Sequence, residues 1–379
     1  MVRRDCLQRL AALAGVGLLK EPRNLAGREP SIASLGDEAL KRGLRYGATP
    51  EADLGQAPPP YTALFAEHCR LLAPNLSWAH VSKSPGQYDF SSQQRNLDFA
   101  QAYSMLLTGA HLLWHERTPA WIEQAGDRAA AGRMVADHIR AMVTRFAGQV
   151  YSWNVVNEAI HPADGRSDGL RNSPLLAKLG NDYLELAFRT AREFDRESLL
   201  VYNDYDLELN NAEQENRRRA LLALLDRLLA ARAPIDAVGL QSHLKLSSCC
   251  FRQEVYRRFL GEIEKRGLKI LITELDVLDN GAPSDIAGRD RAVADAYKRL
   301  LDVALDNRAV IAVVTWGLSD RFTWLTPRFN PSFARPDGLP GRPLPFDSDY
   351  APKRAYGTLL RALQTAPRRR VVEGAGNTG

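Results

Sequence analysis

The chain has 379 residues, of which 45% are hydrophobic, and its 50 Lys and Arg against 45 Asp and Glu give a formal net charge of +5. This length allows two average domains or one large α/β barrel, and the apolar content suffices for a sizeable core. Much of the excess positive charge lies near the ends, at Arg3 and Arg4 and at 368–370, so no basic stripe points to nucleic acid.

The first residues have the features of an export signal. Arg3 and Arg4 precede an apolar run over 10–19 that is too short to span a bilayer. The pattern is similar to a bacterial twin-arginine signal, so we expect residues 1–25 to direct export to the periplasm or the extracellular space. A frayed or amphipathic N-terminal helix is the alternative, because no clear A-x-A cleavage site follows. We expect no membrane segment in the mature protein.

Strand-like and helical runs alternate along the rest of the chain. Apolar and β-branched runs predict eight strands, at 44–48, 69–74, 105–114, 150–156, 199–204, 235–241, 268–273 and 309–316. Amphipathic patterns between them predict helices at 93–103, 128–146, 182–194, 212–231, 253–266 and 289–306. Uniformly apolar strands indicate a parallel sheet covered by helices, and eight βα repeats predict a closed α/β structure, a (β/α)8 TIM barrel over 40–366.

The remaining segments carry less information. Residues 367–379 are rich in glycine and charge, and we expect them to be disordered. Cys69 falls in a strand-like run and is expected in the core. The adjacent Cys249 and Cys250 leave a strained vicinal disulfide open as an alternative to two free thiols.

Two predicted strands each end in a glutamate. Glu158 follows the run at 150–156, and Glu274 follows the run at 268–273. A carboxylate is costly at the end of a buried strand unless it is paired or functional, and strand ends meet on one face of a barrel. The two glutamates therefore predict a shared site, and paired carboxylates cleave glycosidic bonds. Two structural glutamates paired with Arg or Lys at the barrel rim are the alternative.

The other strand ends carry the side chains of a sugar site. They include Trp114, Asn157, Tyr205, Gln241, His243, Asp276 and Trp316. Indole faces stack on pyranose rings, and amides bind hydroxyls. His243 ends the strand before that of Glu274, so we expect it to reach Glu274 and to be oriented by Asp276.

Other chemistries lack their motifs. His111 and His115 share a strand end, but no HExxH follows, so we expect neither a metal nor another cofactor. The G-x-S-x-G elbow of serine hydrolases is absent, as are the GxGxxG and GxxxxGK[ST] phosphate loops.

Nine motifs in one order resemble a known family. They are WHERTPAW (114–121), WNVVNE (153–158), GLRNS (169–173), DYLELAF (182–188), YNDY (202–205), IDAVGLQSHL (235–244), ITELDV (272–277), TWGLSDRFTW (315–324) and PLPFD (343–347). Over about 44–363, the chain resembles the family 10 glycoside hydrolases, mostly endo-1,4-β-xylanases. The resemblance implies a monomer that binds a β-1,4-linked polysaccharide, xylan first, and cleaves it by a retaining double displacement.

The resemblance also implies roles for individual residues. Glu158 would be the acid/base and Glu274 the nucleophile, with their carboxyl groups about 5–5.5 Å apart. Asn157 would bind the sugar 2-hydroxyl beside the cleaved bond, and Gln241 and His243 would surround the nucleophile with Asp276 behind. The remaining expected substrate contacts are Trp114, Trp316 and Trp324, on the non-reducing (glycone) side of the cut, together with Arg117 and Tyr205.

Several glycone positions depart from the family pattern. The usual Glu-Asn-x-x-Lys-Trp after the second strand becomes Ala73-Pro74-Asn75-Leu76-Ser77-Trp78. Ala110 replaces a sugar-binding histidine, and Arg117 replaces a glutamine. In a regular strand His111 would point to the opposite face, so we expect that it cannot substitute for that histidine.

These departures leave two alternatives to a xylanase. One is a related retaining β-glycanase with changed glycone specificity, in which Arg117 could meet a uronic acid carboxylate. The other is a polysaccharide-binding barrel without catalysis.

Overall fold

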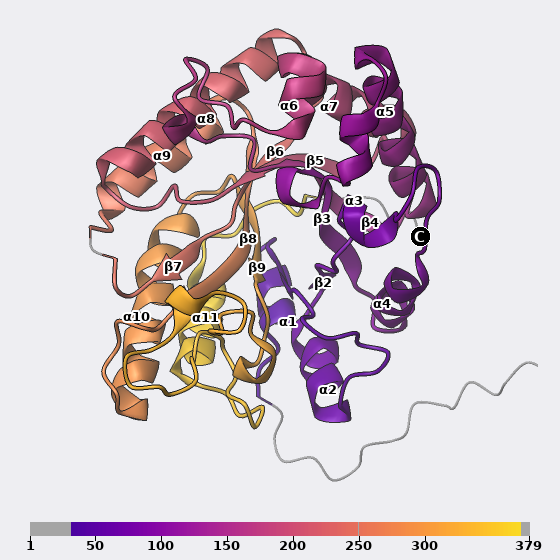
Figure 1. Ribbon diagram of the computed structural model, residues 1–379. Helices are drawn as coiled ribbons and strands as arrows, with labels where there is room; N and C mark the ends of the chain where they lie inside the picture. Colours follow the sequence, from indigo (N-terminus) through magenta and orange to yellow (C-terminus); the bar gives the residue numbers. More distant parts are fainter. Residues whose placement is uncertain (1–31, 249, 373–379) are drawn as a thin grey trace, which may run out of the picture. The chain divides into compact units, whose positions relative to one another are not determined.

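The structure is a computed structural model that describes residues 32–248 and 250–372 (Figure 1). The chain divides into Met1–Ala33 and Ser34–Gly379, and the fold below is that of the second unit. The expected export signal at 1–25 and Cys249 lie outside the described residues, as does the side chain of Ala110.

Within the described residues, eight parallel strands close into a barrel. They are β1 (Arg45–Ala48), β2 (Leu71–Leu72), β3 (Leu106–Trp114), β4 (Val150–Asn157), β5 (Leu199–Asp204), β6 (Ala237–Leu240), β8 (Lys269–Leu278) and β9 (Val310–Thr315). Hydrogen-bonded neighbours run β6-β5-β4-β3-β2-β1-β9-β8, and an additional β6–β8 pairing closes the ring. The predicted TIM barrel is confirmed.

One further strand extends this wall. β7 (His243–Lys245) pairs with β8 and continues the direction of β6 after a break at Gln241 and Ser242. The break coincides with a left-handed backbone at Ser242, whose φ is +62°. β8 therefore runs beyond the strand expected at 268–273, because its second half pairs with β7. The second strand, expected at 69–74, is only two residues long.

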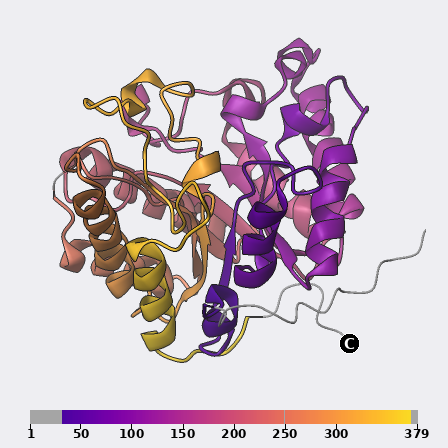
Figure 2. The same ribbon diagram turned by 90° about the horizontal axis from the view of Figure 1, so that it is seen from below.

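Helices cover the outside of the barrel (Figures 1 and 2). The α-helices of the described part are α1 (Leu35–Leu40), α2 (Pro59–His68), α3 (Trp78–Val81), α4 (Ser91–Ala102), α5 (Arg128–Arg145), α6 (Pro174–Leu179), α7 (Tyr183–Phe194), α8 (Ala212–Ala230), α9 (Gln253–Lys265), α10 (Ile286–Ala304) and α11 (Arg354–Thr365). Short 3-10 turns lie at His115–Arg117, Ala120–Gln124, Pro162–Asp164, Gly180–Asp182, Asp320–Phe322 and Pro331–Phe333. Side chains of Asp127, Asn211 and Asp285 accept backbone N–H groups at the starts of α5, α8 and α10, which fixes where these helices begin.

The apolar interior has two parts. The larger cluster packs the outer sides of the strands against the helices, and it includes the predicted core residue Cys69. The smaller one consists of Leu71, Ala73, Tyr151, Val201, Ala237, Leu271, Ile311, Ala312 and Val314. Because side chains alternate along a strand, this cluster fills the inside of the barrel and forms an apolar floor below the polar strand ends.

The C-terminal segment differs from its predicted disorder as far as it is described. The backbone N–H of Arg369 donates to the Arg42 carbonyl at 3.0 Å, and its guanidinium donates to the carbonyls of Leu305 at 2.7 Å and Asn307 at 3.1 Å. An arginine has five N–H donors, so one side chain can bind several backbone carbonyl groups at the base of the barrel. Residues 373–379 lie outside the described part.

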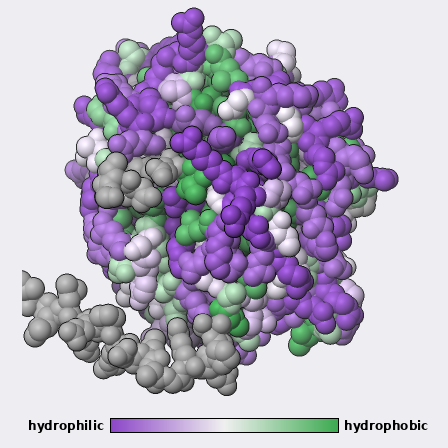
Figure 3. Space-filling model, turned by 180° about the vertical axis from the view of Figure 1, so that it is seen from behind, coloured by the Kyte–Doolittle hydropathy of each residue, from purple (hydrophilic) through white to green (hydrophobic). Residues whose placement is uncertain are grey.

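In the described part of the chain, no helix combines the length and the apolarity needed to cross a bilayer. The face in Figure 3 is mainly hydrophilic, with smaller apolar patches between. Exposed large apolar side chains are scattered: Ile32, Leu40, Tyr103, Phe194, Ile286, Phe329, Leu339 and Val371.

Candidate active site

Glu158 lies at the C-terminal end of β4, and Glu274 lies within the second half of β8. Glu158 directly follows β4 in a left-handed conformation with φ +59°, and its N–H donates to the Asn203 carbonyl at 2.9 Å. The Glu274 N–H donates to the Gln241 carbonyl at 3.0 Å. Both side chains are buried, at 8% and 4% exposure. A left-handed non-glycine residue costs free energy and persists where the surrounding structure holds it, often at functional sites.

Three amide side chains connect the two carboxylates. Asn203 Nδ2 donates to Asn157 Oδ1 and to Glu274 Oε1, at 2.8 Å each. Gln241 Nε2 and Asn157 Nδ2 donate to Glu158 Oε1, at 2.9 and 3.0 Å. The oxygens of both carboxylates are therefore held in fixed directions. Asn203 lies near the end of a predicted strand, within the YNDY motif, but no role at the site was predicted for it.

Glu158 lies in surroundings that favour its protonated form. Burial raises the pKa of Glu158, and the negative charges of Asp204 and Glu274 add to the increase. Hydrogen bonds from Gln241 and from Trp114, whose Nε1 lies 2.9 Å from Glu158 Oε2, oppose it without reversing it. A carboxyl group with a raised pKa is suited to general acid catalysis.

Glu274 has the opposite environment. His243 contacts Glu274 Oε2 through Nε2 at 3.2 Å and Asp276 Oδ1 through Nδ1 at 2.8 Å. Burial alone would raise the pKa of Glu274, but His111 and His243 lower it to about 2. Burial would lower the pKa of His243, yet Asp276 and Glu274 raise it well above its ordinary value, so His243 is held as a cation.

The expectation that His111 faces away from the site is wrong. Its Nε2 lies 3.6 Å from Glu274 Oε1, which is too long for a good hydrogen bond but close enough for electrostatic contact. The register between β3 and β4 shifts on both sides of Thr108, and Gly109 has a φ of +71°. These irregularities break the alternation of side chains, so His111 points into the barrel. A glycine inside a strand was the available signal, because it often marks a bulge.

Two tryptophans from the segment after β9 line the same site. Trp324 donates its Nε1–H to Asp276 Oδ2 at 2.7 Å, and its ring lies 5.0 Å from that of His243. Trp316 lies 6.0 Å from the His243 ring and 6.4 Å from that of His111. Trp324 thus holds the carboxylate that in turn contacts His243.

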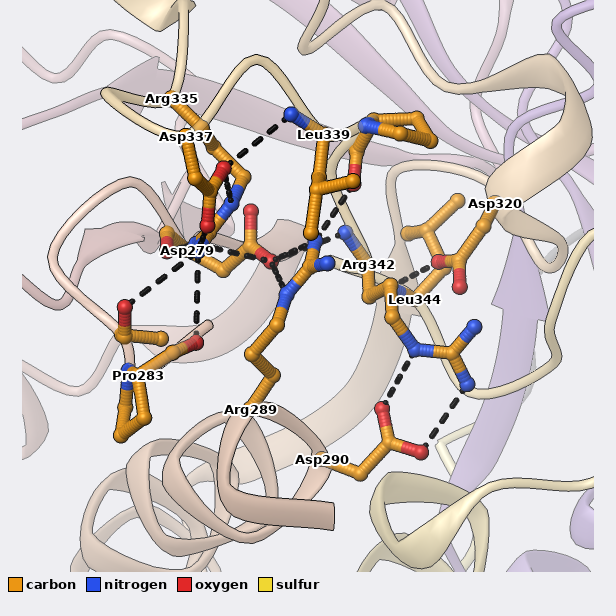
Figure 4. Close-up of polar contacts among 12 residues, drawn as sticks. Asp279, Pro283, Arg289, Asp290, Asp320, Arg335, Asp337, Leu339, Arg342 and Leu344 are labelled. Atoms are coloured by element: carbon orange, nitrogen blue, oxygen red, sulfur yellow. Dashed lines mark hydrogen bonds and ion pairs between the residues drawn. The ribbon is translucent and has the colours of Figure 1, made fainter. Parts of the chain in front are cut away.

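A cluster of charged side chains around the buried Asp279 anchors the long segment that carries Trp324 (Figure 4). Asp279, just after β8, accepts hydrogen bonds from Arg289 Nη2 at 2.8 Å and from the Arg342 N–H at 3.1 Å. Arg335 donates to the Asp279 carbonyl and to the Asp337 carboxylate. Arg342 pairs with Asp290 on α10 at 2.8 Å. We call Asp279, Arg289, Arg335, Asp337 and Arg342 the arginine clamp.

Arg171 forms hydrogen bonds with both Glu158 and Tyr205. Arg171 donates Nε–H to the Glu158 carbonyl and Nη2–H to the Tyr205 hydroxyl, both at 2.9 Å. The Arg217 guanidinium lies 4.1 Å from the centre of the Tyr205 ring. Arg171 was not named as a site residue, although it lies in the GLRNS motif.

The positions that we expected to depart from the family pattern supply little polarity. Ala73 belongs to the apolar floor, and the hydroxyl of the buried Ser77 donates to Asn75 at 2.8 Å. Arg117 is exposed, with its guanidinium 5.4 Å from the centre of the Trp114 ring. Within the described residues, no carboxylate lies at ion-pair distance from Arg117.

Glu51, in the loop after β1, is a further carboxylate that was not expected at the site. Its side chain keeps contact with solvent, yet partial loss of water raises the pKa of Glu51, and the charges of Asp276 and Glu274 raise it further. In the described part of the chain, no group of three or more His, Cys, Asp or Glu side chains is arranged to hold a metal ion.

Comparison with known proteins gives a single family. The model of glycosyl hydrolase family 10 matches residues 34–362. Endo-1,4-beta-xylanase B of Thermotoga neapolitana is 28% identical over 309 residues, 80% of this chain and 83% of that protein. Beta-1,4-xylanase of Dictyoglomus thermophilum is 29% identical over 313 residues, 79% of this chain and 84% of that protein.

Solved structures agree. Xylanase 10B from Thermotoga petrophila RKU-1, in complex with xylobiose, has a TM-score of 0.77 and 28% identity, covering 89% of this chain and 99% of that one. The GH10 structure from Paenibacillus barcinonensis has a TM-score of 0.77 and 27% identity, covering 90% and 100%. The chain therefore belongs to glycosyl hydrolase family 10, the endo-1,4-β-xylanase family.

Proposed function

We propose that the protein hydrolyses the β-1,4 bonds of xylan with Glu274 as nucleophile and Glu158 as acid/base. Glu274 attacks the anomeric carbon while Glu158 gives its proton to the leaving oxygen. Glu158 then takes a proton from water, whose oxygen displaces Glu274 from the anomeric carbon. The observation that carries the proposal is the opposite pKa shift of two carboxylates joined by one amide network.

The surrounding residues have supporting roles in this scheme. His243, held by Asp276, keeps Glu274 ionised, and Gln241 holds Glu158 in place. Asn157 lies between the carboxylates, where it can donate to the 2-hydroxyl of the reacting sugar. Trp114, Trp316, Trp324 and Tyr205 supply the aromatic surfaces on which pyranose rings stack.

The substrate class rests on the relatives. The Thermotoga petrophila xylanase, similar over most of this chain, was solved with xylobiose. We therefore propose xylan and xylo-oligosaccharides as substrates, with the protein acting as a monomer and without a cofactor.

The test measures reducing sugar released from glucuronoxylan and from undecorated xylan. We expect release by the wild-type protein and by Glu215→Ala, a surface variant on α8, and none by Glu274→Ala. Proton NMR of the first product should show a retained β anomer. Inversion, or carboxyl groups near 8 Å apart in a crystal structure, would contradict the retaining mechanism. Binding without release would favour the non-catalytic alternative.

A second candidate is a changed glycone specificity. Arg117 is an exposed cation against Trp114, and the family's polar residues are absent at Ala73 and Ser77. A guanidinium can bind a uronic acid carboxylate through two hydrogen bonds. Arg117→Gln should then lower kcat/KM on glucuronoxylan while leaving undecorated xylan unchanged. Equal effects on both substrates would contradict a role in recognising the decoration.

We also propose that residues 1–25 direct export. The paired arginines and the short apolar run support this. Replacement of Arg3 and Arg4 by lysine should keep the protein in the cytoplasm of a bacterial host, whereas an unchanged distribution would contradict the proposal.

A further inference from the structure

Phe329 is unusually exposed for an aromatic residue beside the active site. It is 61% exposed and stands in the irregular segment between β9 and α11. Its ring lies 5.0 Å from that of Trp324, at an interplanar angle of 82°. Phe333 lies 5.3 Å from Trp324 at 86° and is nearly parallel to Phe329, at 8°. The two phenyl rings thus stand at right angles to the indole.

This group is continuous with the catalytic centre. Trp324 contacts Asp276 at 2.7 Å and the ring of His243 at 5.0 Å, and His243 contacts Glu274 at 3.2 Å. Phe329 contacts Trp324, whereas within the described residues no ring contact joins Phe329 to His243, so Trp324 links Phe329 to the catalytic centre. Aromatic surface therefore extends from the reacting centre outward to solvent.

The segment that bears Phe329 is held firmly. The arginine clamp fixes it to the end of β8 and to α10, through Arg335 on one side of the bend and Arg342 further along. Within the bend, the Phe329 N–H donates to the Thr326 carbonyl at 3.0 Å, and the Phe333 N–H donates to the Asn330 carbonyl at 2.9 Å. An exposed ring on a fixed backbone can bind a ligand with little loss of conformational freedom.

We propose that Phe329, supported by Phe333, is an additional sugar-binding platform that stacks on a xylose ring farther from the cleaved bond than the ring at Trp324. The proposal rests on the function given above and names a specificity determinant of the same site. Pyranose rings present apolar C–H faces that pack on aromatic rings. Successive rings of a twisted polysaccharide do not share one plane, which suits two aromatic surfaces set at right angles.

The platform also offsets a deficit nearer the cleavage point. Ala73 has no hydrogen-bond donor in its side chain and the Ser77 hydroxyl donates to Asn75, so neither side chain is expected to hold a short substrate. A distal stacking contact is available only to longer chains. The enzyme should therefore have a higher kcat/KM for long xylo-oligosaccharides than for short ones.

The test compares kcat/KM for xylohexaose and xylotriose in wild type, Phe329→Ala, Phe329→Tyr and Ile286→Ala. Ile286 is the matched control, because it is 60% exposed and apolar but lies at the start of α10. We expect Phe329→Ala to lower kcat/KM for xylohexaose about five- to tenfold and to leave xylotriose within about twofold, as for one lost stacking contact. Phe329→Tyr should retain the wild-type ratio, and so should Ile286→Ala.

If Phe329→Ala leaves the ratio of kcat/KM for xylohexaose to that for xylotriose unchanged, the proposed platform is overturned. Equal losses of kcat/KM on both substrates would overturn it as well. Failure of the wild type to cleave either oligosaccharide would instead contradict the proposed function. Even if the wild type cleaves neither oligosaccharide, titration calorimetry of xylohexaose into Glu274→Ala, with and without Phe329→Ala, tests the platform. Equal affinities of the two proteins for xylohexaose would overturn it. A dimer seen by sedimentation that disappears in Phe329→Ala would show that the surface is occupied by a second copy instead.

Discussion

Arg171 donates its Nε–H to the carbonyl oxygen of Glu158 at 2.9 Å, and the backbone of Glu158 is left-handed, with φ +59°. The contact fixes the carbonyl, so the direction in which the Glu158 side chain leaves the strand depends on a residue thirteen positions away. Arg171 therefore positions the proposed acid/base without touching the reacting atoms.

We expect Arg171→Lys to lower kcat on xylan by about ten- to a hundredfold, because a hydrogen bond from a charged group contributes about 1.5–3 kcal/mol. Lysine keeps the charge but cannot reach both the Glu158 carbonyl and the Tyr205 hydroxyl. Arg166→Lys, in an exposed pair with Asp168 in the same segment, is the control and should change kcat little. Steady-state kinetics with equal kcat in both variants would contradict the positioning role.

His243→Gln should shift the acid limb of the kcat/KM profile to higher pH. The wild-type His243 cation stabilises the ionised form of Glu274, whose pKa is lowered to about 2. Without that cation the pKa of Glu274 rises, and activity, which needs ionised Glu274, is then lost at a higher pH during acidification. His80→Gln, on the exposed part of α3, should leave the limb in place. An unmoved limb in His243→Gln would show that His243 does not control the ionisation.

Gly109→Ala should destabilise the fold and reduce activity together. The position has a φ of +71°, although an added Cβ would meet only the Ala73 Cβ at 3.5 Å and the Asn154 amide at 4.0 Å. The cost is therefore backbone strain of about 1 kcal/mol rather than a clash, and relief of that strain would turn His111 away from Glu274.

Gly132→Ala in α5 is the opposite case for the same substitution. Its φ is not in the left-handed region, and a Cβ would make only ordinary contacts at 3.8 Å. We expect about 0.5–1 kcal/mol of stabilisation there, since alanine favours helix. Urea unfolding of both variants measures the change in the free energy of unfolding. Changes of the same sign in Gly109→Ala and Gly132→Ala would refute the argument from backbone conformation.

Arg335→Ala should lower the free energy of unfolding by about 1–3 kcal/mol, because it leaves the carbonyls of Asp279, Ala282 and Pro283 without their donor, although Arg289 still pairs with the Asp279 carboxylate. The Arg335 side chain is 2% exposed, in contact with Asp279 and Asp337. Arg128→Ala removes an ion pair with Asp182 whose side chains are 62% and 79% exposed, and it should have no measurable effect. Similar unfolding midpoints for the two variants would mean that the arginine clamp does not stabilise the segment after β9.

Much of the barrel could be predicted because the hydrophobic periodicity of strands and helices is visible in short stretches of sequence. The runs ending at Glu158 and Glu274 were recognisable as buried strands, and parallel strands must bring such ends to one face. The position of His111 could not be predicted from alternation, because one left-handed glycine changes the direction of every later side chain in β3. The arginine clamp was also not predictable, since Asp279 and Arg335 lie far apart in sequence and the segment joining them has no period.

β2 is the weakest part of the wall. It pairs with β1 and β3 through only Leu71 and Leu72, whereas β3 and β4 are held along most of their length and β8 pairs with three strands. Ala73 and Ser77 follow β2, whereas Glu158 directly follows the well-paired β4 and Glu274 lies within β8. We expect substitutions in the segment after β2 to leave the two glutamates in place. A change of substrate specificity through this segment should therefore need few compensating mutations. Mutant libraries aimed at new substrates should be concentrated on residues 73–78.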